Sequence, residues 1–325
     1  MRAPEFWQQE GIGSSLLTPI SKLYSIGARI WYRRHRPWQA PIPVICIGNV
    51  TIGGGGKTPL AMSIGARLSA RGHAIHFLTR GYRGRLTGPV LVEKELHTAF
   101  DVGDEPLLLA EVAPTWVARD RAASAKAAIK AGAEILVMDD GLQNPTLAKS
   151  CSFLVVDGGY GFGNGKTIPA GPLRESLSDV LKRTEDVVIV EPDDFGLEEF
   201  FQGKVKISKV AFKASPKVVE SMRGSRVVAF AGIARPTKFF QTLYQIDCDV
   251  VRTFEFTDHH FYSVDEVMQI VETANRLKAK PVTTTKDSTR LPSMSKMMVH
   301  VFPIEVVWQD NNDLDSLLDR ALELS

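Results

Sequence analysis

The stretch PVICIGNVTIGGGGKTP at residues 43–59 indicates how this chain folds. An apolar run typical of a buried strand leads into four consecutive glycines at 53–56, and these lead into Lys57, Thr58 and a helical pattern. Glycines lack Cβ atoms, so their backbone N–H groups can converge on phosphate oxygens at the positive end of the following helix. A strand, loop and helix start of this kind predict a nucleotide-phosphate site of the P-loop type.

The side chains at the end of this loop have distinct expected tasks. Lys57 supplies a cation near the terminal phosphates, and Thr58 offers a hydroxyl to Mg²⁺. The strict P-loop motif has glycine six residues before the lysine, where this chain has Thr51. The strand before the loop and the helix after it still favour phosphate binding over a plain glycine-rich turn.

A second Gly-Lys-Thr stands at residues 165–167, and it also follows an apolar run, Phe153–Val156. Pro169 and Pro172 come shortly after it. These prolines prevent the helix whose N-terminus would have to hold a phosphate. We therefore expect a rigid loop beside the first site and no second nucleotide site.

Apolar runs alternate with helical patterns after residue 41, which is typical of an α/β protein. This alternation predicts a P-loop NTPase-like fold, a mostly parallel sheet with helices on both faces. The predicted strands are Val44–Ile47, Ile75–Leu78, Val90–Val92, Ile135–Met138, Phe153–Val156 and Val187–Val190. The predicted helices include Thr58–Ala70, Glu105–Ala113 and Ala122–Ala131.

A second, smaller α/β unit is predicted for residues 224–325. The first unit is expected to span 39–205, with residues 1–38 as part of the same domain, and the polar, irregular stretch 206–223 is interpreted as a linker. The strands predicted for the second unit are Val227–Ala231, Val250–Phe254, Val282–Thr285 and Val299–Val307, and its helices are Thr237–Tyr244 and Val264–Lys278.

Composition argues against several classes of function. The 39 Lys and Arg residues against 37 Asp and Glu residues give a net charge of +2, too small for a protein that coats nucleic acid. Cys46, Cys151 and Cys248 are far apart and odd in number, which argues against a disulfide framework and a zinc site. The chain has neither an apolar run of about 18 residues nor a signal-peptide pattern, so we expect no membrane span.

Residues 1–38 show the pattern of a basic amphipathic helix. Apolar residues recur near helical spacing beside basic ones, namely Leu16, Ile20, Leu23, Ile30 and Trp31 beside Lys22, Arg29, Arg33, Arg34 and Arg36. Such a helix can lie in a bilayer interface, with its cations near anionic headgroups. The alternative is a helix that packs on its own domain.

Two adjacent carboxylates, Asp139 and Asp140, follow the apolar strand at 135–138. Open α/β sheets bind ligands at the carboxyl ends of their strands, and the segment resembles a Walker B strand. One carboxylate of the pair can hold Mg²⁺, while alternation along the strand turns the other elsewhere. Capping of a turn at the strand end is the alternative.

Two further polar segments allow more than one interpretation. Asp104 and Glu105 precede a helical pattern, where acidic residues also serve as caps. The segment Asp258-His259-His260 can bind a metal, take part in catalysis or form a polar turn. Composition alone does not choose between these roles.

Together, these segments resemble the tetraacyldisaccharide 4′-kinase family, the lipid A kinases, over nearly the whole chain. Even Thr51, the departure from the strict loop motif, agrees with that family. The matching segments are Gly-Asn-Val-Thr at 48–51 with the glycine loop, Thr-Arg-Gly-Tyr at 79–82, Gly-Asp-Glu-Pro at 103–106, Asp-Asp-Gly-Leu-Gln at 139–143, Phe-Gly-Asn-Gly at 162–165, Pro-Ala-Gly-Pro-Leu-Arg-Glu at 169–175, Phe-Thr-Asp-His at 256–259 and Thr-Thr-Lys-Asp at 284–287.

The resemblance implies transfer of the γ-phosphoryl group of ATP to the 4′-hydroxyl of a tetraacylated glucosamine disaccharide 1-phosphate, which gives lipid IVA. It implies ATP and Mg²⁺ as cofactors. It also implies a peripheral protein at the cytoplasmic face of the bacterial inner membrane, in contact with the anionic surface through its N-terminal helix. No obligatory protein partner is expected.

By the same resemblance, Asp104 is the base that accepts the proton of the sugar hydroxyl, His259 orients that base, and Lys57 stabilises charge on the phosphates. We expect the reacting centre to lie between the two units, because His259 belongs to the second. The expected Mg²⁺ ligands are Thr58, Asp139 and Glu175. The expected nucleotide or anion contacts are Thr51, Gly53, Gly54, Gly55, Gly56, Lys57, Thr58, Glu105, Arg121, Asp140 and Arg174.

Two other functions are compatible with a P-loop. A regulatory nucleotide switch or metallochaperone would need a base-recognition or metal motif, but the Thr-Lys-Asp at 285–287 falls in the second unit. A non-enzymatic, membrane-bound anion-binding protein would not need the paired acids or the Gly-Asp-Glu-Pro segment. Of the three functions, only the kinase requires a lipid acceptor.

Overall fold

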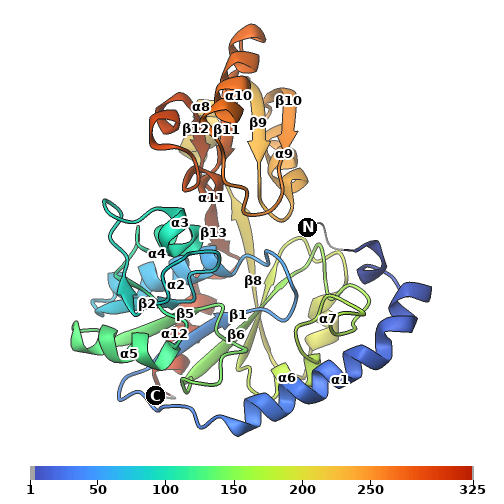
Figure 1. Cartoon of the computed structure of the whole chain (residues 1–325), viewed down its shortest axis with the longest axis vertical. Helices are drawn as coiled ribbons and strands as arrows, with labels where there is room; N and C mark the ends of the chain where they lie inside the picture. The colour runs from blue at the N-terminus through green and yellow to red at the C-terminus, as the bar shows by residue number, and fades with distance from the viewer. Residues whose placement is uncertain (1–3, 324–325) are drawn as a thin grey trace.

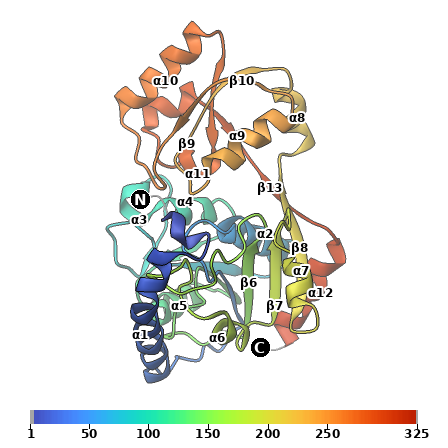
Figure 2. The same ribbon diagram turned by 90° about the vertical axis from the view of Figure 1, so that its right-hand side faces the viewer.

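The computed structural model describes residues 4–323, which form two α/β units stacked along the long axis of the molecule (Figures 1 and 2). The extreme ends of the predicted terminal segments, residues 1–3 and 324–325, lie outside the described residues. Each unit is built around its own sheet. The predicted α/β class with a smaller second unit is therefore confirmed.

The larger sheet has nine strands, and the apolar run before the phosphate loop forms its central one. Its strands are β1 (Val44–Gly48), β2 (Ile75–Thr79), β3 (Val90–Leu91), β4 (Thr115–Val117), β5 (Ile135–Asp139), β6 (Cys151–Asp157), β7 (Asp186–Val190), β8 (Lys206–Lys213) and β13 (Glu305–Trp308). They lie in the order β13-β8-β7-β6-β1-β5-β2-β4-β3. Only the two outermost strands, β13 and β3, pair antiparallel with their neighbours. All residues of β1 are buried, as expected of a parallel strand covered on both faces.

Helices cover both faces of this sheet. On one face, Leu60, Ile64 and Leu317 share a core with apolar residues of β1 and β5. On the other face, Ala125 and Phe201 pack against the reverse sides of the same strands. The helices of this unit are α2 (Lys57–Ala70), α3 (Ala99–Val102), α4 (Asp104–Leu109), α5 (Arg121–Lys130), α6 (Leu177–Leu181), α7 (Leu197–Phe201) and α12 (Asn311–Glu323), besides α1 and a short 3-10 turn at Glu5–Trp7.

The smaller unit has a four-stranded parallel sheet in the order β10-β9-β11-β12. Its strands are β9 (Arg226–Ala231), β10 (Asp249–Glu255), β11 (Lys280–Thr284) and β12 (His300–Phe302). Its helices are α8 (Pro216–Met222), α9 (Pro236–Gln245), α10 (Val264–Arg276) and α11 (Thr285–Ser288), with a 3-10 turn at Ser293–Met298. Phe240 of α9 and Ile270 of α10 fill cores on opposite faces of the sheet.

The prediction that residues 206–223 form a linker is wrong, because most of them form regular secondary structure. Residues 206–213 are β8, which pairs with β7 and extends the large sheet. Residues 216–222 are α8, whose Met222 already packs in the core of the smaller unit. Three lysines make β8 look irregular, but alternate residues Ser208 and Val210 are buried. The predicted single strand at 299–307 also divides, because β12 stays in the smaller sheet while β13 returns to pair with β8. The smaller unit is thus inserted into the larger one.

Helix α1, Ile12–Arg34, runs along the outside of the larger unit (Figure 1). Its small polar residues face the protein: Ser14 and Ser21 are buried, and Ser21 Oγ donates to the Thr167 carbonyl at 2.7 Å. Its large apolar residues face outward, and the most exposed are Ile12 at 82%, Leu16 at 74% and Leu23 at 70%. The helix therefore packs on its own domain, as one interpretation predicted, but by its polar face. None of the helices within residues 4–323 combines the length and apolarity that crossing a bilayer requires.

Candidate active site

The phosphate loop joins β1 to α2 at the carboxyl edge of the large sheet. Gly56 has φ of 81°, and a Cβ atom there would lie 2.4 Å from the Phe212 ring, so no other residue fits. Lys57 begins α2 and is buried; its Nζ donates to Asn49 Oδ1 at 3.2 Å and lies 3.8 Å from Asp140 Oδ1. The lysine cation is therefore held back over the loop, where phosphate oxygens would lie.

Thr51, the departure from the strict motif, has a contact within this loop. The Asn49 side-chain amide donates to the Thr51 hydroxyl at 3.3 Å, while its oxygen accepts from Lys57. Asn49 is itself buried. The threonine hydroxyl thus helps to fix which way Asn49 points, and through it the lysine.

Thr58 and Asp139 meet at the N-terminal end of α2. Thr58 Oγ1 donates to Asp139 Oδ2 at 2.9 Å, and the carboxylate is completely buried. Asp139 Oδ1 is also buried and has no hydrogen-bond partner within the described chain. Burial raises the pKa of Asp139, and the neighbouring carboxylates Glu105 and Asp140 raise it further. A hydroxyl beside an unpaired carboxylate oxygen is a donor set that suits Mg²⁺.

The second Gly-Lys-Thr is confirmed as a loop beside the first. Residues 168–176 after it are not helical, and they lie against the phosphate loop. Arg174 N donates to the Val50 carbonyl at 2.7 Å, and Ile52 N donates to the Pro172 carbonyl at 2.9 Å. The segment therefore braces the phosphate loop and brings the Arg174 side chain to it.

Arg174 and Glu175 belong to one hydrogen-bonded cluster. Arg174 Nη1 donates to both oxygens of Asp140, at 2.8 and 3.0 Å. Both oxygens of Glu175 are occupied, one by Gln143 Nε2 at 2.9 Å and the other by Arg183. Neither oxygen of Glu175 has a hydrogen bond to Thr58 or Asp139 among the described residues, so its expected role as a Mg²⁺ ligand stays a prediction.

Arg121 is near enough to the paired acids for their charges to affect it. It is buried at the start of α5, its Nη1 donates to the Ala118 carbonyl, and its Nε has no partner within residues 4–323. Burial lowers the pKa of Arg121 to about 10, although the negative charges of Asp140 and Asp139 partly oppose this shift. The guanidinium remains charged at neutral pH and offsets the acidic pair.

Asp104 begins α4 and receives groups from the other unit. Gly103 before it has φ of 93°, and a Cβ atom there would lie 2.6 Å from the Tyr82 carbonyl oxygen. The His259 Nδ1–H donates to Asp104 Oδ2 at 2.8 Å, and Arg290 Nε lies 3.4 Å from the same oxygen. Burial would raise the pKa of Asp104, but His259, Lys286 and Arg290 outweigh burial and lower it to about 2.

The backbone around His259 is fixed by the larger unit. Arg83 Nη1 donates to the carbonyl oxygens of Asp258 and His259 at 3.1 and 3.0 Å. His259 itself has φ of 59°, an uncommon conformation for a residue with a side chain. His260 points elsewhere and pairs with Glu266 at 3.1 Å. The structure thus brings the first histidine of the pair to Asp104, as the resemblance implied.

Asp104, Glu105 and His259 are close enough to hold a metal ion. A protein cation already stands among them, because Lys286 Nζ lies 3.3 Å from Glu105 Oε1 and 3.5 Å from His259 Nε2. An ammonium in that position neutralises the two carboxylates and would repel a metal ion. We therefore interpret this group as an acid and base cluster rather than a metal centre.

The two clusters adjoin each other. The Glu105 charge is near enough to contribute to the raised pKa of Asp139, which links the Asp104 group to the phosphate loop. A second contact between the units lies near the loop as well: Arg235 and Lys238 both pair with Asp157, and Arg235 Nη2 donates to the Gly54 carbonyl at 3.3 Å. The loop, the paired acids and the Asp104 group therefore share one site between the units.

Sequence reasoning did not assign Asn49, Lys286 or Arg290. Lys286 lies in the Thr-Thr-Lys-Asp segment that carries part of the family resemblance, so this motif could have marked it as a candidate site residue. Arg290 has no such signal; it reaches Asp104 because Asp287, one turn earlier, binds its Nη2 at 2.7 Å and holds it. Both side chains contact the first unit across the interface, which residue patterns do not show.

Comparisons with known proteins agree on one family. Residues 13–323 match the family model described as tetraacyldisaccharide-1-P 4′-kinase. Relatives named tetraacyldisaccharide 4′-kinase are 45% identical in Rhodospirillum centenum, 44% in Rhodospirillum rubrum and 43% in Gluconobacter oxydans. These matches cover at least 99% of this chain and at least 97% of each relative.

One solved structure has the same fold over nearly its whole length. It is the structure of LpxK from Aquifex aeolicus in complex with ATP, with a TM-score of 0.74 and 23% sequence identity. The match covers 95% of this chain and 99% of that one. The inserted arrangement of two α/β units is therefore found in a known architecture.

Proposed function

This chain belongs to the tetraacyldisaccharide-1-P 4′-kinase family, and from that premise we propose how its residues carry out the reaction. It is an ATP-dependent kinase that transfers the γ-phosphoryl group to the 4′-hydroxyl of a tetraacylated glucosamine disaccharide 1-phosphate. The observation that best supports the residue assignment is the contact of Asp104 with His259, which sets a base and its partner beside the phosphate loop.

The phosphate loop binds and orients the triphosphate. The glycines at 53–56 allow backbone N–H groups to approach the phosphate oxygens, and Lys57 offsets the charge that develops on the β- and γ-phosphates. In the described structure its Nζ is bound to Asn49 and lies near Asp140. Contacts within the protein thus direct Lys57 to the loop, which limits the reorganisation that the reaction requires.

Thr58 and Asp139 are the residues that would hold Mg²⁺. The unpaired Asp139 Oδ1 and the Thr58 hydroxyl supply hard oxygen ligands next to the position of the phosphates. When bound there, Mg²⁺ would supply positive charge that neutralises the phosphates. Asp140 is engaged by Arg174, so we assign it to positioning Lys57 and Arg174 instead.

Asp104 accepts the proton of the 4′-hydroxyl as the phosphoryl group is transferred. Its low pKa keeps it ionised at neutral pH, and the His259 N–H donated to Oδ2 fixes the direction of the carboxylate. Among residues 4–323, Asp104 Oδ1 accepts a hydrogen bond only from the backbone N–H of Glu105, at 3.0 Å. That oxygen has a free lone pair with which to meet the sugar hydroxyl.

The outward apolar face of α1 supports contact with a membrane. A helix that packs on its domain by serines and exposes isoleucine, leucine and tryptophan presents a surface that a bilayer interface would cover. Arg33 and Arg34 in its last turn would lie near anionic headgroups. We assign the protein to the cytoplasmic face of the inner membrane, attached peripherally, because ATP is available there.

The test is a direct assay of the product. The protein with ATP, Mg²⁺ and the tetraacyl disaccharide 1-phosphate should add one phosphate to the lipid, detected by mass spectrometry. ATP consumption should depend on the lipid acceptor, whereas a regulatory nucleotide switch would consume ATP without it. Lipid-independent hydrolysis, with no phosphorylated lipid, would contradict the proposed reaction.

A further inference from the structure

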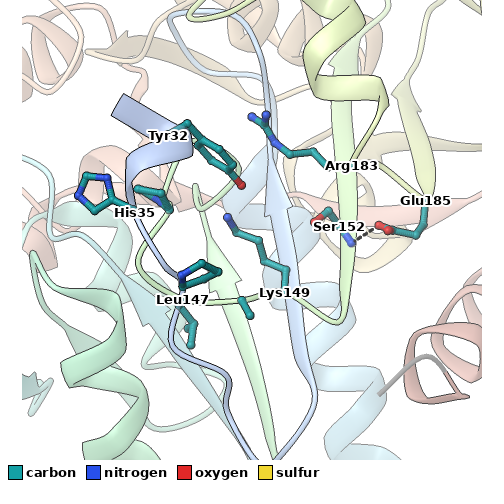
Figure 3. Close-up of a pocket in the computed structure, with 10 residues that line it drawn as sticks. Tyr32, His35, Leu147, Lys149, Ser152, Arg183 and Glu185 are labelled. Atoms are coloured by element: carbon teal, nitrogen blue, oxygen red, sulfur yellow. Dashed lines mark hydrogen bonds between the residues drawn. The ribbon is translucent and has the colours of Figure 1, made fainter. Parts of the chain in front are cut away.

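A separate cavity of about 280 Å³ lies at the amino ends of β6 and β7, under the last turn of α1 (Figure 3). It is lined by Tyr32, His35, Lys149, Ser152, Arg183 and Glu185, with apolar walls from the segment around Leu147. The phosphate loop follows the carboxyl end of β1, so the cavity lies at the opposite edge of the sheet. The proposed reaction uses none of the residues that line it.

Two cations in this cavity converge on one ring. Arg183 lies 4.6 Å and Lys149 5.7 Å from the centre of the Tyr32 ring, and Figure 3 shows both side chains directed to that tyrosine. Lys149 Nζ donates to the Asn144 carbonyl, and no carboxylate lies within ion-pair distance of it among the described residues. An ammonium without a carboxylate partner has positive charge to offer to a ligand.

Arg183 also has donor capacity left. One of its nitrogens pairs with Glu175, but its Nε is buried and finds no partner in the part of the chain that the structure describes. Its Nη1 likewise makes no hydrogen bond to another described residue, and an anion in the cavity would supply an acceptor to it. The Tyr32 hydroxyl likewise makes no hydrogen bond to another described residue and can donate to the same ligand.

Glu185 supplies a carboxylate to the wall of the cavity, but this carboxylate points away from the two cations. Glu185 accepts a hydrogen bond from the Ser152 backbone N–H, and Figure 3 shows this pair apart from Lys149, Tyr32 and Arg183. Burial raises the pKa of Glu185, and its hydrogen bond to the Ser152 backbone directs it away from the two cations. The ligand that suits the cluster is therefore an anion with several acceptor oxygens, such as a phosphate ester.

The position of the cavity indicates where that ester comes from. Tyr32 and His35 belong to the end of α1 that carries Ile30 and Trp31 on its exposed face, 47% and 51% accessible. We propose that this cavity binds the phosphate group of an anionic phospholipid, with Lys149, Arg183 and Tyr32 as donors, and so fixes the depth and orientation of α1 at the membrane. The inference rests on the proposed membrane contact of α1.

Two kinds of vesicle separate a phosphate site from general attraction between charges. One carries phosphatidylglycerol and the other a fatty-acid carboxylate, both in phosphatidylcholine and adjusted to equal surface potential. The wild-type protein should bind the phosphate-bearing vesicles roughly fivefold more tightly, an effect comparable to one basic residue at an anionic surface. Lys149→Ala and the conservative Tyr32→Phe should each reduce that preference, while turnover on substrate in detergent stays unchanged.

Arg33→Ala is the matched control, because it also removes one positive charge, from the end of α1 beside the cavity, but Arg33 does not line the cavity. It should weaken binding to both kinds of vesicle equally and keep the preference for phosphate. Equal losses for Lys149→Ala and Arg33→Ala on both vesicles, with no preference in the wild type, would overturn the proposed site.

A short-chain phosphatidylglycerol, kept below its micelle concentration, tests the cavity without a bilayer. Titration calorimetry should detect its binding to the wild type and a clear loss in Lys149→Ala. If the protein binds this monomer but not the vesicles, the membrane contact is refuted and the phosphate site is kept. If it binds the vesicles but not the monomer, the phosphate site alone is refuted. Lys149→Ala could instead raise the KM for the disaccharide substrate in detergent without phospholipid. That result would show that the cavity binds the phosphate of the substrate, and it would overturn the proposal that the ligand is a phospholipid.

Discussion

The two halves of the active site are built in different ways. The nucleotide half is local: Lys57, Thr58 and Asp139 come from one strand, one loop and one helix start, and their contacts stay within the larger unit. The base half is assembled from both units, because Asp104 is contacted by His259, Lys286 and Arg290 of the inserted unit. From this difference we expect that the larger unit alone is enough to hold nucleotide, whereas both units are needed to activate the acceptor.

The strongest test of this division is Asp104→Ala. The variant should lose about 10²- to 10⁴-fold in kcat, the range of a positioned general base. Its affinity for ATP, measured by calorimetry, should stay within about twofold, because the nucleotide half does not depend on Asp104. Near-normal turnover would refute the base assignment, and a large loss of ATP affinity would show that the two halves are not separate.

Lys57→Ala should affect the other half. We expect a loss of about 10²- to 10³-fold in kcat, as when one preorganised group that stabilises transition-state charge is removed. Affinity for ATP should fall as well, in contrast to Asp104→Ala. The measurements are steady-state kinetics with the lipid acceptor and calorimetry with ATP; kinase activity close to that of the wild type would contradict the phosphate site.

Lys286→Met tests whether the inserted unit tunes the base. In the wild type the pKa of Asp104 is about 2, below its usual value, so this carboxylate stabilises the fold above about pH 4 and the contribution is lost as the pH falls through 2. Removing one cation should raise that pKa by roughly one unit. We expect kcat to fall about tenfold and the acid limb of kcat/KM to move to higher pH. A lower kcat with an unmoved acid limb would indicate a structural role only.

Asp157→Asn should have the smallest effect. It weakens the other contact between the units, the pairing of Asp157 with Arg235 and Lys238, while leaving the groups around Asp104 in place. Turnover should fall by only about two- to fivefold, since partly exposed ion pairs contribute little, and the pH profile should match the wild type. If turnover falls as much as in Lys286→Met, with the same pH shift, then any weakened contact between the units affects the base. Lys286 would then have no specific effect on Asp104.

The nucleotide half was largely predictable from the sequence. Glycines 53–56, Lys57 and Thr58 are consecutive in the sequence. Asp139 is 81 residues from Thr58, but it ends a strand whose apolar pattern is plain, and parallel strands present their carboxyl ends at one edge of a sheet. Gly165-Lys166-Thr167 could be rejected in the same way, because the prolines after it act on the local backbone. These inferences used local backbone patterns and the general rule that parallel strands end at one edge.

The base half and the domain boundary were less predictable. Arg290 lies more than 180 residues from Asp104, and only the packing of the inserted unit brings them together. Strand β8 was missed because its lysines hide an alternation in which only Ser208 and Val210 are fully buried. The division of the predicted strand at 299–307 was missed because the partner of β13 is almost a hundred residues earlier. The sequence did not show that the apolar face of α1 points outward. That orientation depends on the residues that cover its serines, which helical spacing does not reveal.

The return of β13 and α12 to the larger unit has a consequence for biosynthesis. Leu317 and Leu318 of α12 are fully buried against the same core as α2, the helix that carries Lys57, and Arg67 and Arg71 of α2 pair with Asp315. During translation, the phosphate loop leaves the ribosome some 250 residues before this support does. The first unit therefore cannot complete its sheet and core until the inserted unit, β13 and α12 have been synthesised. A nascent kinase would bind nucleotide firmly only when almost the whole chain has emerged.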